Sequence, residues 1–332
     1  MSGATLGVAA RLKTQPYPSA AIGVDIGGTK TLAVTYLPDQ ILAHARIATN
    51  TAGSPEEILR STAKLIATLR TQAHDSGIEV PCVGLGLPGI LSTDRMFVDS
   101  IILPRWKNVN VERILLQMLD DDIELTIDND AVMMARGQWT LKAGNGHGIL
   151  VCLTLGTGVG ASVILNGTPL RGPDGIAGQL GHMSVNASGR QCVCGGIGCL
   201  NAYASGTAIT ERYLQRDDAT TQHISPIDGR WVGDQAAKGN RIAQAIIDET
   251  AVYLGVGIAS LINIFNPSHV IIGGGVSDLG EALLAPARRV AHKRSFPSAA
   301  ARARITTPHY RSSAGAVGAA IAALHAHEAD SP

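Results

Sequence analysis

The sequence is poor in aromatic residues and has no excess of either charge. Phe, Trp and Tyr make up only 4% of the 332 residues, against 38 glycines, so tight backbone turns are expected rather than an aromatic core. Lys and Arg total 27, and so do Asp and Glu, which leaves a net charge of zero. This balance gives no broad attraction for nucleic acid or an anionic membrane, so any ligand must be recognised by a local site.

The chain also lacks a convincing membrane segment and a disulfide framework. Two uncharged stretches, 149–165 and 251–277, approach membrane-span length, but glycine interrupts the first and asparagine and proline the second, so both are predicted to be buried soluble elements. Residues 1–18 contain no apolar run typical of a signal peptide. Five cysteines, an odd number, are expected to be reduced. Together these features predict a cytoplasmic protein without nucleic-acid or membrane partners.

The length and periodicity predict a two-domain α/β protein with an internal duplication, because a strand, glycine turn and strand at 21–37 recur at 148–163. A helix is predicted to begin after Ser54, since Ser54 and Glu57 have capping-box spacing and Pro55 follows the cap. The domain boundary is placed near residue 128. The other expected strands are 41–49, 83–87, 124–127 and 269–272, and the other expected helices are 111–119, 202–214, 236–265, 279–294 and 314–327.

Three glycine-rich loops follow predicted strands and are candidates for nucleotide binding. Their amides can close on phosphate oxygens, and a carboxylate beside the first loop can hold hydrated Mg²⁺. Each loop alone could be an ordinary hairpin turn, but two in the same context could clamp a triphosphate, and the third could lie against adenine or ribose. The residues are Asp25, Gly27, Gly28, Thr29 and Lys30 in the first loop, Gly156, Thr157 and Gly158 in the second, and Gly273, Gly274 and Gly275 in the third.

Two aspartates stand at the carboxyl end of the strand predicted at 124–127. Phosphoryl transfer needs a carboxylate that accepts the proton of the attacking hydroxyl, and Asp128 or Asp130 could supply it. The alternative is that Asp128 or Asn129 caps the following helix, and both roles can be filled by different residues.

Four soft ligands lie within eighteen residues of a glycine-punctuated segment, at His182, Cys192, Cys194 and Cys199. This spacing predicts a tetrahedral structural Zn²⁺ that organises a loop, since no position is left open for a reacting water. The less favoured alternative is free buried thiols beside an unrelated histidine.

These motifs resemble the ROK family of sugar kinases and sugar-responsive repressors, over almost the whole chain from residue 22 to residue 323. The resemblance rests on Asp25-Ile26-Gly27-Gly28-Thr29-Lys30, Gly86-Leu87-Pro88-Gly89, Asn129-Asp130-Ala131, Leu155-Gly156-Thr157-Gly158-Val159-Gly160, Gly178-Gln179-Leu180-Gly181-His182, Cys192-Val193-Cys194-Gly195, Gly198-Cys199-Leu200, and Asn263-Ile264-Phe265-Asn266-Pro267 before Gly273-Gly274-Gly275.

The resemblance implies an actin-like ATPase fold, ribonuclease H-like and duplicated, in which two α/β domains flank a cleft. The domains would be 21–128, completed by a helix at 314–328, and 129–313, with the zinc loop at 182–199. The implied activity is ATP- and Mg²⁺-dependent phosphorylation of a primary hydroxyl of a hexose, amino sugar or sugar-like cyclitol, by a homodimer or larger oligomer. The implied general base is Asp130, and the implied substrate contacts are Asn129, Asp130, Gly89, Gln179, His182 and Asn201.

Three residues depart from the pattern of the family's sugar kinases. Gln179 and Asn201 stand where glutamates are typical, and Ile102 stands where asparagine is expected before Leu103. An amide changes the donors and acceptors offered to ring hydroxyls, so the substrate is expected to differ on the side of the anomeric carbon, as in a carbocyclic ring.

Two other functions remain open from the sequence. A sugar-responsive transcription factor would need a DNA-binding domain ahead of residue 22, where only about twenty residues are present, too few for a helix-turn-helix unit. A catalytically silent sugar sensor is supported only by Gln179 and Asn201. The intact Asp25, Asp130 and glycine loops favour a kinase.

Overall fold

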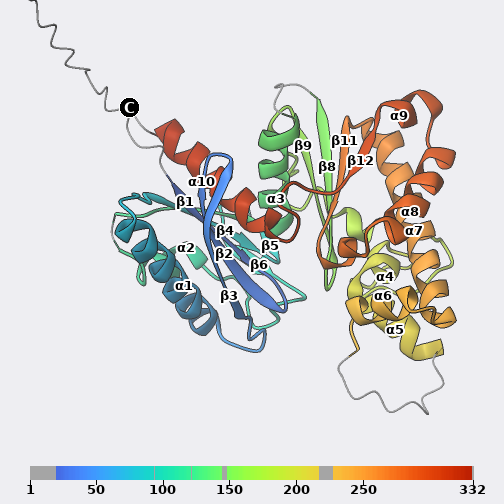
Figure 1. The fold of residues 1–332 in the computed structure, drawn as a ribbon, viewed down its shortest axis with the longest axis horizontal. Helices are drawn as coiled ribbons and strands as arrows, with labels where there is room; N and C mark the ends of the chain where they lie inside the picture. Colours follow the sequence, from blue (N-terminus) through green and yellow to red (C-terminus); the bar gives the residue numbers. More distant parts are fainter. Residues whose placement is uncertain (1–19, 93, 121, 144–147, 217–226, 331–332) are drawn as a thin grey trace, which may run out of the picture.

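The computed structural model describes residues 20–92, 94–120, 122–143, 148–216 and 227–330, which form two α/β halves (Figure 1). The segment 1–18, in which no signal peptide was expected, lies outside the described residues. The strands of the first half are β1 (Ala21–Ile26), β2 (Lys30–Leu37), β3 (Gln40–Ala48), β4 (Cys82–Leu87), β5 (Ile90–Leu91), β6 (Phe97–Asp99) and β7 (Glu124–Asn129). Those of the second half are β8 (Ile149–Leu155), β9 (Val159–Leu165), β10 (Thr168–Pro169), β11 (His269–Gly273) and β12 (Arg304–Thr306).

The two halves use the same sheet topology. The strand order is β3-β2-β1-β4-β7 in the first five-stranded sheet and β10-β9-β8-β11-β12 in the second. In both sheets an antiparallel meander is followed by two strands that pair in parallel. The duplication predicted from the recurring strand–turn–strand pattern is therefore confirmed at the level of topology.

The helices are α1 (Pro55–Asp75), α2 (Val111–Leu116), α3 (Asp130–Gln138), α4 (Asn201–Ala204), α5 (Gly206–Arg216), α6 (Gly229–Ala237), α7 (Arg241–Phe265), α8 (Glu281–Arg294), α9 (Pro297–Arg302) and α10 (Ala314–Asp330). The capping box that was expected at Ser54 is present, with Ser54 Oγ accepting from Glu57 N and the Glu57 carboxylate accepting from Ser54 N.

Two predicted helices are each divided in the structure, so the predictions of single helices at 236–265 and 202–214 were wrong. Gly239 has a φ of +92°, and the Asn240 side chain accepts from Ala243 N at 3.0 Å, which ends α6 and begins α7. Ser205 is extended, with φ −77° and ψ 155°, and separates α4 from α5. Helix α9 and strand β12 are too short to have given a periodic signal.

The helices and sheets are layered, with α10 and α3 between the two sheets and α1 and α7 on the outer faces (Figure 1). Alternation along β1 explains this arrangement, because successive side chains point to opposite faces of a strand. Ile22, Val24 and Ile26 join the core under α1, whereas Ala21 joins the alanine-rich core under α10.

Helix α7 is the one helix of the described residues whose length and composition could cross a membrane. It packs against the second sheet and α8, and Ile246, Leu254 and Ile258 are fully buried there. Its apolar character is therefore accounted for by the core of the second half.

Helix α10 lies so close to β1 and β4 that only glycine fits at positions 23 and 84. A Cβ built on Gly23 would lie 1.9 Å from Ala316 O, and one built on Gly84 would lie 1.9 Å from Ala319 O. Neither neighbour is a movable side chain. The helix backbone therefore rests directly on the sheet.

We predict that Gly84→Ala lowers the free energy of unfolding by about 3 kcal/mol, because backbone atoms cannot rotate away from the added methyl group. The matched control is Gly77→Ala, where φ is +74° and nothing lies within 4 Å of the added Cβ, so only backbone strain of about 1 kcal/mol is expected. Urea unfolding measures both, and equal losses in the two variants would contradict the close packing of α10.

Candidate active site and metal cluster

Two of the predicted glycine loops are hairpin turns of the same kind, and they face each other. Gly27 N donates to Lys30 O at 2.9 Å in the β1–β2 turn, and Gly156 N donates to Gly158 O at 2.8 Å in the β8–β9 turn. A Cβ built on Gly28 would lie 3.3 Å from Thr157 Oγ1. The first half and the second half thus bring their glycine loops within contact distance.

The third loop lies behind the second. A Cβ on Gly273 would meet Met134 and one on Gly274 would meet the backbone of Leu155, so these two glycines permit close packing, and Gly274 also has a φ of +84°. Only Gly275 has open space around its added Cβ. It is the member of the triplet best placed to leave a bare surface.

The start of α5, which was not among the predicted site residues, joins this group. Gly206 N donates to Gly156 O at 2.7 Å, and Thr207 Oγ1 donates to Thr157 O at 2.9 Å. The N-terminus of α5 therefore lies beside the second glycine loop. Two of its first amides are already bonded, Gly206 N to Gly156 O and Ala208 N to Ser205 Oγ, and the partial positive charge of the helix N-terminus favours anions nearby. The sequence feature that could have indicated this helix start is Gly206, which follows Ser205 directly and is the first residue of α5.

The Asp128-Asn129-Asp130 segment divides its roles between three side chains. Asn129 caps α3, with Oδ1 accepting from Ala131 N at 2.9 Å and from Val132 N at 3.2 Å, while its amide donates to Gly89 O at 3.0 Å. Of the two residues considered as caps, Asn129 is therefore the one used. The same bonds hold the Gly89 loop against the start of α3.

Asp128 forms an ion pair that no local sequence pattern indicates. Arg171, from the loop after β10, contacts both carboxylate oxygens of Asp128, with Nη1 at 3.1 Å from Oδ1, and the Asp128 side chain is buried. A carboxylate held by a guanidinium is a poor proton acceptor. Of the two aspartates, Asp130 is the one whose carboxylate has no such partner among the described residues.

Asp25, near the end of β1, and Asp130, the first residue of α3, are brought together although they are far apart in the sequence. Burial raises the pKa of Asp130 to about 7, and the nearby charge of Asp25 adds to this increase. Burial likewise raises the pKa of Asp25 to about 6, with Lys30 opposing it. Gly315, in the first turn of α10, leaves room for the Asp25 carboxylate, because an added Cβ would lie 2.4 Å from Oδ2.

The four predicted metal ligands converge in the structure. Their ligand atoms all lie within 4.8 Å of one another, with His182 Nδ1 3.6 Å from Cys192 Sγ and Cys194 Sγ 3.7 Å from Cys199 Sγ. Four ligands that surround a metal tetrahedrally at about 2.0–2.3 Å are separated by about 3.3–3.8 Å, so the cluster fits such an ion. A hydrogen bond from the Gly196 amide lowers the pKa of the Cys194 thiol, which favours the ligating form.

The three positions that depart from the family pattern differ in their surroundings. Ile102 lies against the first glycine loop, 3.0 Å from a Cβ built on Gly28. Gln179 is exposed and its side chain makes no hydrogen bond to the described residues. Asn201 Oδ1 accepts from Val159 N at 2.8 Å and its amide contacts Cys192 Sγ at 3.7 Å.

The paired sheets and the carboxylates at their strand ends define an actin-like ATPase fold of two domains, as comparison with solved structures shows. A ROK family glucokinase from Streptomyces griseus, crystallised with glucose and AMPPNP, is 31% identical with a TM-score of 0.80, and the match covers 92% of this chain and 100% of that one. The ROK hexokinase from Thermus thermophilus is 29% identical, with a TM-score of 0.71 and coverage of 93% and 99%.

The chain belongs to the ROK family, whose sequence model matches residues 21–326. A glucokinase from Thermotoga maritima is 36% identical over 312 residues, which is 90% of this chain and 95% of that protein. The xylose repressor of Caldicellulosiruptor bescii is 32% identical over 248 residues, or 73% of this chain and 62% of the repressor. The family resemblance inferred from the motifs is confirmed.

We predict that Asp130 makes the free energy of unfolding fall as the pH rises from about 4 to about 7. Its folded-state pKa lies above the unfolded value, so the stabilisation is complete below the unfolded pKa and is lost as the pH rises through the folded pKa. Asp130→Asn should remove this part of the slope, and Asp25→Asn should lower the pKa of Asp130. Urea unfolding across this range measures both effects, with the exposed Asp234→Asn as control; an unaltered slope in Asp130→Asn would refute the assignment.

Proposed function

We propose that the protein is an ATP-dependent kinase that phosphorylates a primary hydroxyl of a hexose, amino sugar or sugar-like cyclitol. The observation that carries this proposal is the meeting of Asp25 and Asp130 near two facing glycine loops. The glucokinase relatives support a sugar kinase. We also propose that the domains divide near residue 128, with α10 completing the first, and that the protein acts in the cytoplasm as a homodimer.

Asp130 is the general base in this proposal. It accepts the proton of the acceptor hydroxyl, and a pKa of about 7 lets it hold that proton near neutral pH. Asn129 orients the start of α3 and the Gly89 loop, so the acceptor is held from the same side. Base strength and orientation are thus supplied by adjacent residues.

The nucleotide is held by the glycine loops and the start of α5. Amides at Gly27 to Lys30 and Gly156 to Gly158 would bind the phosphates, and Gly273 to Gly275 would lie against the nucleoside. Asp25 is the residue that would hold the water ligands of Mg²⁺, which when bound neutralises charge on the transferred phosphoryl group. The base and the phosphate-binding elements therefore come from different strands.

The metal proposed for the four-ligand cluster is zinc, in a structural role. His182 faces Cys192 through Nδ1, so its Nε2 is available for a substrate hydroxyl. The cluster would hold this ring in one orientation and tautomer. Reduced thiols are needed for this set, in agreement with a cytoplasmic location.

The proposed substrate differs from glucose on the side of the anomeric carbon. Asn129 and Asp130 match the family pattern at the part of the site that would hold the hydroxyl receiving the phosphoryl group. Gln179, Asn201 and Ile102 depart from the family pattern at positions that would contact the other side of the ring. A site deprived of carboxylates accepts fewer hydrogen bonds from ring hydroxyls. A carbocyclic ring without the anomeric hydroxyl, of the valiolone type, suits that change.

A catalytically silent sugar sensor is the second candidate, favoured by the similarity to xylose repressors together with the altered Gln179 and Asn201. It would bind a sugar without consuming ATP. A coupled ATPase assay over a panel of sugars and cyclitols, read in parallel by mass spectrometry of the products, separates it from a kinase.

We predict that Asp130→Asn lowers kcat by about 10²–10⁴-fold while nucleotide affinity changes little, because only proton acceptance is lost.

We also predict the order of kcat/KM values for a panel of glucose, mannose, N-acetylmannosamine, glucosamine and a valiolone-type cyclitol. The cyclitol, or another ring altered at the anomeric side, should have a higher value than glucose. Glucose as clearly the best acceptor would contradict the substrate proposal, and full activity in Asp130→Asn would contradict the base assignment.

We predict one zinc ion per chain by metal analysis of the purified protein. Cys194→Ala should lose the metal together with activity, and because Cys194 is exposed its side chain contributes little to core packing. Cys152→Ala is the matched control, since Cys152 is buried in β8 away from the cluster and should leave the zinc in place. Active wild-type protein that contains no metal would refute the zinc site.

A further inference from the structure

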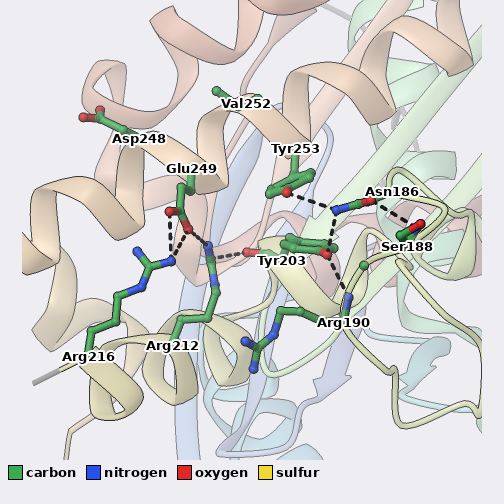
Figure 2. A pocket seen from close by; sticks show the side chains of 11 residues that line it. Asn186, Ser188, Arg190, Tyr203, Arg212, Arg216, Asp248, Glu249, Val252 and Tyr253 are labelled. Atoms are coloured by element: carbon green, nitrogen blue, oxygen red, sulfur yellow. Dashed lines mark hydrogen bonds and ion pairs between the residues drawn. The ribbon is translucent and has the colours of Figure 1, made fainter.

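The short helix α4 follows Cys199 in the chain and precedes α5, and its residue Tyr203 lies among Tyr253, Asn186 and Arg190 (Figure 2). Tyr203 stacks on Tyr253 with ring centroids 3.8 Å apart, and its hydroxyl accepts from Arg190 N at 2.9 Å and from the Asn186 amide at 3.3 Å. Arg212 donates to the carbonyl oxygen of Tyr203 at 2.5 Å. These contacts attach α4 to the metal loop and to α7.

The inner side of α4 carries Asn201, whose two polar atoms have different partners. Oδ1 accepts from the amide of Val159, at the end of the second glycine loop, and Nδ2 contacts the sulfur of Cys192. A Cβ built on Gly158 would lie 3.3 Å from Oδ1, so the loop backbone approaches this side chain closely. One amide therefore joins the metal cluster to the glycine loop.

Further along, the same segment contacts the glycine loop twice more. Gly206 N donates to Gly156 O and Thr207 Oγ1 donates to Thr157 O. The segment that begins at the ligand Cys199 thus reaches every residue of the loop from Gly156 to Val159 by a bond or a close approach. Displacement of the cluster would be transmitted to the loop through α4.

Asparagine has the donor and the acceptor that this position requires. Aspartate would keep an acceptor for Val159 N but would lose the donor and place a negative charge beside a thiolate. Alanine would lose both bonds and leave the Val159 amide without this partner. Both polar ends of Asn201 are used within the protein, so the side chain has little left to offer a ring hydroxyl.

We infer that Asn201 is a positioning residue that links the metal cluster to the nucleotide-binding glycine loop, in place of a direct contact with the phosphoryl acceptor. The inference rests on the proposed function for the role of the loop, but the link itself is structural. Acceptor affinity would then depend on other residues, among them Gln179. Nucleotide affinity would depend on the cluster.

The test compares Asn201→Ala with Asn201→Asp. In Asn201→Ala the KM for ATP and the Kd for Mg-ADP, measured by calorimetry, should rise about five- to tenfold, and a colorimetric chelator should remove zinc faster. In Asn201→Asp the Val159 bond is kept, so ADP affinity should stay within about twofold of wild type while zinc release is faster. The KM for the acceptor should change least in both variants.

The matched control is Asn186→Ala, which removes an amide from the metal loop on the outer side of α4, away from the glycine loop. It should leave the Kd for Mg-ADP unchanged, and thermal unfolding of all variants should confirm that they are folded. Unchanged zinc release and ADP affinity in Asn201→Ala, with an effect confined to the acceptor KM, would overturn the inference. Zinc release can be measured without catalytic turnover, so it tests the link through Asn201 alone. Absence of product from the wild-type protein would instead refute the proposed kinase function.

Discussion

The approach of α10 to the sheet and to α3 is the constraint on which the candidate site depends. Glycines allow it on both sides, because a Cβ on Gly23 or Gly84 would overlap the helix backbone, and a Cβ on Gly318 would lie 2.1 Å from Met133 O in α3. Since α3 also packs against β8 and β9, this helix pair holds the two halves together. The carboxylates of Asp25 and Asp130 lie at neighbouring strand ends of the first sheet, since Asp25 pairs with Gly86 of β4 and Gly86 pairs with Asp128 of β7.

Their closeness has an electrostatic cost that suits the proposed chemistry. Burial raises the pKa of both carboxyl groups; the charge of Asp25 adds to the increase at Asp130, whereas Lys30 opposes the increase at Asp25. Asp128, two positions before Asp130, instead forms an ion pair with Arg171. The two aspartates on either side of Asn129 therefore have different partners, and of these two only Asp128 is paired with an arginine among the described residues.

The second half is organised around a different centre, the four-ligand cluster. It anchors the segment from Cys199 to Thr207, which reaches the glycine loop through one side chain and two further bonds. Where the family's sugar kinases typically carry glutamate, Asn201 is bonded within the protein. The amide of Asn201 thus contacts both the glycine loop, through Val159 N, and the four-ligand cluster, through Cys192 Sγ.

The sequence by itself determined the features that depend on near neighbours. Three features could be predicted from the sequence because a few neighbouring residues supply every group needed. They are the capping box at Ser54, the duplicated strand–turn–strand pattern, and the four soft ligands in one loop. Only the tertiary structure decided which carboxylate faces Asp25, that Arg171 neutralises Asp128, and that Asn201 bonds to the glycine loop. These contacts join residues 42, 43 and 105 positions apart, and they depend on how strands and loops distant in the sequence pack together, which no local pattern encodes.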